Sequence, residues 1–122
     1  PLFGPGFYKD VEACLSDNGI VVSQGESPFY FADIQKSMLE VLNNQFDKTY
    51  MYNFSNLTYP GGLWSFTFAS KALCPLNDFD EQRVKDSNLE FNYYNCGVHR
   101  AAFELPNFQR KNLKGLIQNP MR

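Results

Sequence analysis

The chain has 122 residues, of which 43% are hydrophobic and 20% charged, and these values are typical of one soluble globular domain. Its net charge of −2 offers no basic surface for nucleic acid or for an anionic membrane. No apolar run approaches the length of a membrane span, and no signal peptide is visible. Because the three cysteines, Cys14, Cys74 and Cys96, are odd in number and widely spaced, we expect reduced thiols in a cytoplasmic protein.

The first part of the chain predicts a helix, a strand and a second helix. Residues 7–15 carry apolar side chains at helical spacing and end at Asn18-Gly19, a pair typical of a helix C-terminus. The β-branched run at 20–22 indicates a buried parallel strand. The polar cluster at 23–27 follows its carboxyl end, where open α/β sheets bind ligands. Residues 31–45 then predict a long helix with a single apolar stripe.

Two strands rich in aromatic residues follow. Residues 48–54 and 63–70 both alternate with the two-residue period of a strand. Each strand is expected to gather its rings on one face, namely Tyr50, Tyr52 and Phe54 in the first and Trp64, Phe66 and Phe68 in the second. Beyond residue 71 the pattern weakens. It predicts one short helix near 80–84, another at 108–116 and no element around 98–103.

The turn before the second aromatic strand is the place where we expect a ligand. Its sequence is Tyr59-Pro60-Gly61-Gly62, in which proline presets one backbone angle and the glycines permit positive φ. Tyr59 and Trp64 flank this turn, so a phenol and an indole can meet at the entrance of the strand. The alternative is that both rings belong to the ordinary core.

The order of elements favours an α/β layer with partly parallel strands. The strand at 20–22 is apolar throughout, yet nothing before it in the sequence can serve as its neighbour. A buried parallel strand with a bare edge is unfavourable. We therefore interpret the chain as the second half of a larger doubly wound domain.

Three separated blocks carry a family resemblance. They are Ile-Val-Val-Ser-Gln-Gly-Glu-Ser at 20–27, the stretch 58–71, and Tyr-Tyr-Asn-Cys-Gly-Val-His-Arg-Ala-Ala-Phe-Glu-Leu-Pro-Asn-Phe at 93–108. Together they resemble the polyamine aminopropyltransferases, in the bacterial spermidine synthase branch. The resemblance implies transfer of an aminopropyl group from decarboxylated S-adenosylmethionine, a co-substrate rather than a cofactor, to putrescine. The products are spermidine and methylthioadenosine.

The same resemblance implies a methyltransferase-type Rossmann-like fold, of which residues 1–122 match the C-terminal part of the catalytic domain. The N-terminal β domain, the Gly-rich nucleotide loop and the loop with the general-base Asp are expected before Pro1. We therefore expect no catalytic residue in this chain and no activity from it alone. Its expected partners are the two substrates, the missing N-terminal half and further copies in a homodimer or homotetramer.

The resemblance also assigns putrescine-binding residues. Gln24 would contact the diamine from the end of its strand, Tyr59 would hydrogen-bond or stack at the amine with Pro60 fixing its approach, and Trp64 would line the channel. Glu26 would add negative potential, although a solvated loop glutamate is an equal alternative.

Other readings of the sequence stay open beside this one. We interpret His99 and Arg100 as structural or subunit-contact residues, and one His with three scattered Cys makes no metal-ligand set. The alternative functions are an aminopropyl- or methyltransferase-like enzyme with another amine acceptor, and a non-catalytic Rossmann-half binding or assembly module.

Overall fold

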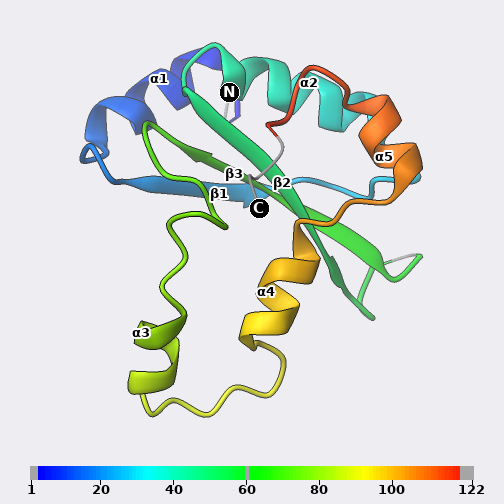
Figure 1. Ribbon diagram of the computed structural model, residues 1–122. Helices are drawn as coiled ribbons and strands as arrows, with labels where there is room; N and C mark the ends of the chain where they lie inside the picture. The colour runs from blue at the N-terminus through cyan, green and yellow to red at the C-terminus, as the bar shows by residue number, and fades with distance from the viewer. Residues whose placement is uncertain (1–2, 60, 119–122) are drawn as a thin grey trace.

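The computed structural model describes residues 3–59 and 61–118. The elements in chain order (Figure 1) are α1 (Pro5–Cys14), β1 (Ile20–Gln24), α2 (Ala32–Asn43), β2 (Lys48–Ser55), β3 (Leu63–Ser70), α3 (Glu81–Asp86), α4 (Cys96–Ala102) and α5 (Asn107–Asn112). The helices and strands predicted up to residue 71 are confirmed to within a few residues. None of the helices in the described ranges has the length and apolar character needed to cross a membrane.

The sheet has the strand order β1-β3-β2, and both neighbouring pairs are antiparallel. The prediction of partly parallel pairing is therefore wrong. The physical reason lies in the connections. The segment with α2 joins β1 to β2 and leaves one strand position free between them, and the turn after β2 brings β3 into that position. β3 becomes the central strand and pairs with β1 from Gln24↔Phe66 to Ile20↔Ser70.

β1 is also less buried than its sequence predicts. Ile20 is 44% exposed and Val22 47% exposed, because both point to a face of the sheet that the described helices leave partly open. Within the described ranges β1 pairs with β3 alone, so its other edge carries no strand. The buried-strand prediction is wrong for this chain taken by itself.

The two faces of the sheet are covered differently (Figure 1). Helices α1, α2 and α5 lie over one face, where two buried clusters form the core. The members of these clusters are Tyr8, Leu42, Phe46 and Ala69, then Leu39, Met51, Leu105 and Leu113. The other face carries the predicted aromatic rows, confirmed by the strand register. Residues 71–103, here called the arm, fold with α3 and α4 beneath this face.

Side-chain caps begin both helices of the arm. The Asp80 carboxylate accepts a hydrogen bond from the backbone N–H of Arg83 at the start of α3, and Asn95 accepts one from Val98 at the start of α4. α4 occupies the region for which the apolar pattern predicts no element. A short helix with a polar cap forms here without a long amphipathic stripe.

His99 fixes the arm through both ring nitrogens. Its Nε2 lies 2.8 Å from the Pro75 carbonyl oxygen, and its Nδ1 lies 3.0 Å from the Tyr94 hydroxyl. Since a carbonyl can only accept, Nε2 carries a proton and donates it to this hydrogen bond. The imidazole also stacks on Phe79 with ring centroids 3.8 Å apart. In the described structure this histidine has a structural role.

Candidate functional site

The ends of β1 and β3 bring the predicted polar and aromatic residues together. Gln24 is the last residue of β1 and lies opposite Phe66 of β3. Trp64 lies two residues before Phe66, so it occupies the same face and the diagonal position to Gln24. Diagonal neighbours of this kind are roughly 7–8 Å apart, within reach of one small ligand. The side chain of Gln24 is exposed.

Tyr59 stacks on Trp64 at the mouth of the β2–β3 turn. The two ring centroids are 4.2 Å apart and the planes differ by 14°. Tyr59 is 41% exposed whereas Trp64 is only 7% exposed, so the phenol shields the indole. The turn reaches this shape because Gly61 and Gly62 adopt φ values of +86° and +71°. Pro60, the fourth predicted contact residue, lies outside the described residues.

The Trp64 indole N–H is buried and has no hydrogen-bond acceptor among the residues that the structure describes. Indole nitrogen is a donor only, and a buried donor without an acceptor is unfavourable. An acceptor from a bound molecule or from further polypeptide would satisfy it.

Glu26 follows β1 after Gly25 and adopts a positive φ of 65°. Its carbonyl oxygen accepts a hydrogen bond of 2.7 Å from the hydroxyl of Ser65, the neighbour of Trp64 in β3. Gln24, Glu26, Tyr59 and Trp64 therefore gather at one end of the sheet. The group offers one amide, one carboxylate and one stacked ring pair, a combination suited to a cation with an apolar chain.

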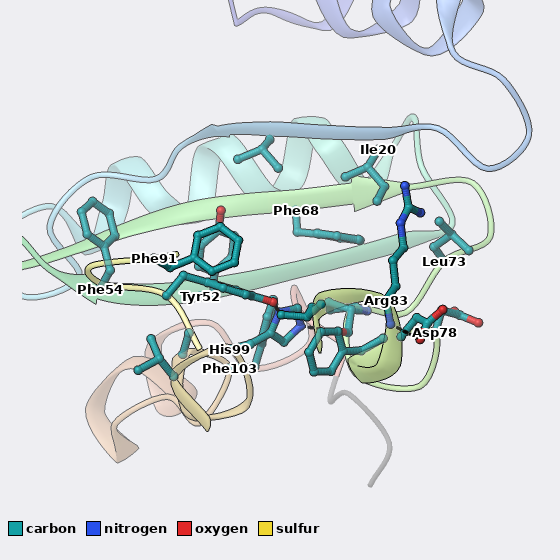
Figure 2. Close-up of a pocket in the computed structure, with 18 of the residues that line it drawn as sticks. Ile20, Tyr52, Phe54, Phe68, Leu73, Asp78, Arg83, Phe91, His99 and Phe103 are labelled. Atoms are coloured by element: carbon teal, nitrogen blue, oxygen red, sulfur yellow. Dashed lines mark hydrogen bonds between the residues drawn. The ribbon is translucent and has the colours of Figure 1, made fainter. Parts of the chain in front are cut away.

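A hollow lies between the aromatic face of the sheet and the arm (Figure 2). Its volume is about 750 Å³, and sheet and arm both line it, among them Ile20, Tyr52, Phe54, Phe68, Leu73, Phe91, His99 and Phe103. Burial raises the pKa of Tyr52 and that of Tyr50 beside it, so both phenols stay neutral. The mostly apolar wall suits further apolar side chains better than a charged small molecule.

The sequence pattern does not reveal this hollow. The wall on the sheet side follows from the alternating rings of β2 and β3, which are visible in the sequence. The opposite wall depends on how the arm packs against the sheet, and no local sequence pattern predicts that packing. Among residues 3–59 and 61–118, no group of three or more His, Cys, Asp and Glu side chains is placed to hold a metal ion.

Comparison with known proteins gives consistent matches. The family profile described as "Spermine/spermidine synthase domain" matches residues 1–81. The polyamine aminopropyltransferase of Thermotoga maritima is 40% identical over 112 residues, which cover 92% of this chain and 38% of the relative. That of Caldicellulosiruptor bescii is 42% identical and covers 93% and 40%, and that of Methanocaldococcus jannaschii is 40% identical and covers 96% and 41%.

Solved structures match equally well. The crystal structure of spermidine synthase from Thermotoga maritima superposes with a TM-score of 0.87 at 40% identity, over 92% of this chain and 38% of that one. A spermidine synthase in complex with the transition state analogue AdoDATO gives the same values. This chain thus spans about two-fifths of the length of the relatives that it matches. It belongs to the spermine/spermidine synthase family.

Proposed function

We propose that this chain supplies one wall of the diamine site of a spermidine synthase. The observation that carries the proposal is the Tyr59–Trp64 stack, which lies on the same face and at the same end of the sheet as Gln24. Relatives about 40% identical bear the name polyamine aminopropyltransferase. The proposed reaction moves an aminopropyl group from decarboxylated S-adenosylmethionine to putrescine.

The chemistry explains why this wall is built from rings and acceptors. In the proposed displacement, a C–N bond forms at the carbon attached to the sulfonium while the C–S bond breaks. Its electron pair stays on sulfur and gives methylthioadenosine. The attacking amine must be neutral, whereas alkyl ammonium groups have pKa values near that of lysine, about 10.4. One end of putrescine must therefore lose a proton while the other remains an ammonium that needs a binding partner.

The described residues fit the ammonium end and the methylene chain. The amide oxygen of Gln24 would accept hydrogen bonds from the ammonium, and the Glu26 carboxylate would add negative potential. Tyr59 and Trp64 would cover the four methylene groups and attract the cation through their π faces, a contribution of roughly 0.5–2 kcal/mol. We place the base that takes the other proton outside this chain, and we assign no catalytic residue within it.

We also propose that further polypeptide completes the sheet. β1 lacks a second strand partner among the described residues, and Ile20 and Val22 stay partly exposed beside the apolar hollow. About three-fifths of each relative's sequence lies outside the part that this chain matches. In the proposal, that portion supplies the nucleoside site and the general base, and the complete enzyme forms a homodimer or homotetramer.

A chimera tests the proposed function directly. In the Thermotoga maritima relative, the matching C-terminal segment would be replaced by residues 1–122 of this chain. The assay would follow methylthioadenosine formation from decarboxylated S-adenosylmethionine, with putrescine or the longer amine spermidine as acceptor. We expect activity that prefers putrescine, because an indole at the position of Trp64 would shorten the proposed channel.

The unmodified relative is the control for the assay, and circular dichroism establishes whether the chimera is folded. A folded chimera without transferase activity, beside an active control, would overturn the proposal. Activity that prefers spermidine would support the alternative of a different amine acceptor.

A further inference from the structure

We propose that Gln35 and Ser65 are positioning residues that hold residues 24–26, here called the corner, in the shape that binds the amine. The inference rests on the proposed function, because it concerns the same diamine site. Both residues are buried, and neither belongs to the set that the family resemblance assigns.

Gln35, on the inner side of α2, reaches the corner with its side-chain amide. Its Nε2 donates to the Gly25 carbonyl oxygen at 2.8 Å and to the Ser65 hydroxyl at 2.9 Å, and it lies 3.4 Å from the Glu26 carbonyl oxygen. The Ser65 hydroxyl in turn donates to the Glu26 carbonyl oxygen at 2.7 Å. The two protons of one amide and the proton of one hydroxyl thus tie two successive carbonyls of the corner to α2 and β3.

The backbone of the corner needs this support. Glu26 adopts a positive φ of 65°, which a residue with a Cβ rarely takes unless its surroundings fix it. Gly25 passes so close to β3 that an added Cβ would lie 2.6 Å from the Ser65 hydroxyl oxygen. The Gly25 N–H donates to the Ser65 carbonyl oxygen at 2.8 Å. The corner is therefore held close against β3 in an unfavourable backbone conformation.

Gln35 and Ser65 act on the site through the backbone alone. In the β1–β3 register, Ser65 points to the face opposite Trp64 and Gln24, where α2 lies. Gln24 and Glu26, the first and last residues of the corner, are the two residues of the corner assigned to the proposed diamine site. If the corner loses its fixed shape, the side chains that receive the ammonium lose their common geometry, while the Tyr59–Trp64 stack remains.

The variant Gln35→Met tests this role, because methionine keeps the volume and removes the donors. Gln109→Met is the matched control. Gln109 is also a buried glutamine, but its Nε2 donates hydrogen bonds to Asn53 and Met51 of β2 and not to the corner. If Gln35→Met leaves the corner of the chimera in its binding shape only a tenth of the time, the KM for putrescine should rise about tenfold. The KM for decarboxylated S-adenosylmethionine should stay unchanged, and Gln109→Met should alter neither KM.

Amide hydrogen exchange on the folded chimera without substrates gives a readout that needs no activity. We expect the Gly25 amide to lose protection in Gln35→Met and in Ser65→Ala, and to keep it in Gln109→Met. An inactive wild-type chimera would refute the proposed function while leaving this measurement intact. Unchanged Gly25 protection, or a KM for putrescine that responds equally to both Gln→Met variants, would overturn the positioning role.

Discussion

Removal of the Tyr59 ring should weaken putrescine binding without unfolding the protein. The ring stacks on Trp64 with centroids 4.2 Å apart, and Tyr59 is 41% exposed. Contact of an aromatic face with an ammonium and its methylene chain contributes roughly 0.5–2 kcal/mol. Tyr59→Ala should therefore raise the KM for putrescine about 2- to 30-fold. Loss of the ring pair should cost only about 0.5–1.5 kcal/mol of stability.

Tyr59 is a better test than its partner Trp64. Trp64 is 7% exposed, and truncation of a buried ring of this size costs about 3–5 kcal/mol of stability. A loss of that size would confuse binding with unfolding. The half-exposed Tyr59 avoids the difficulty.

The assay is steady-state formation of methylthioadenosine by the chimera at saturating decarboxylated S-adenosylmethionine, with putrescine varied. Tyr59→Phe is the matched variant, because it keeps the ring and removes the hydroxyl. If the π face carries the interaction, the KM of Tyr59→Phe stays near that of the wild type. If the hydroxyl bonds to the amine, Tyr59→Phe behaves like Tyr59→Ala. A KM for Tyr59→Ala within about twofold of the wild type would refute the assignment of this ring to the site.

Three further predictions concern stability and association. Gly25→Ala should lower the free energy of unfolding in urea by about 1–3 kcal/mol, because the new Cβ meets the Ser65 hydroxyl. The control is Gly6→Ala in α1, where an added Cβ has nothing within 4 Å, and it should raise the free energy of unfolding by about 0.5–1 kcal/mol. Equal effects of the two variants would contradict the close approach at the corner. The Arg100 hydrogen bond lowers the pKa of Glu81, so the contribution of this pair to stability is complete above the ordinary glutamate pKa, about 4.3, and is lost as the pH falls through the lowered value. The amide exchange rate of α3 should therefore rise in that acidic range. In Glu81→Gln this rise should be absent. If the rise persists in the variant, another titrating group causes it. Finally, the 122-residue chain alone should associate through the free edge of β1, and light scattering that shows a monomer at every concentration would contradict this.

Local periodicity predicts the faces of the sheet correctly. The alternation at 48–54 and 63–70 places three rings on one side of each strand, and the register confirms both rows. Periodicity contains no information about which strands pair. The run at 20–22 is apolar enough for a buried parallel strand, yet it pairs antiparallel with β3 and remains half exposed. Strand pairing depends on the whole path of the chain.

The site was predictable only in part for the same reason. The family resemblance identifies Gln24, Glu26, Tyr59 and Trp64 as a group, and the strand register, the Tyr59–Trp64 stack and the Ser65–Glu26 hydrogen bond bring them to one end of the sheet. The roles assigned to them remain predictions. Gln35 could not be found from the sequence, because a glutamine in an amphipathic helix normally faces solvent. Only the fold shows that this one lies beneath the corner.

The central place of β3 has a consequence for the synthesis of the protein. Ile20 pairs with Ser70, roughly 50 residues later in the chain, and contacts of such separation form slowly. As the chain leaves the ribosome, β1 and β2 emerge before β3, and the edges of both strands that pair with β3 stay unoccupied until that strand is complete. During that interval two strand edges are available to other chains. Chaperone dependence during translation should therefore be greatest before β3 has emerged.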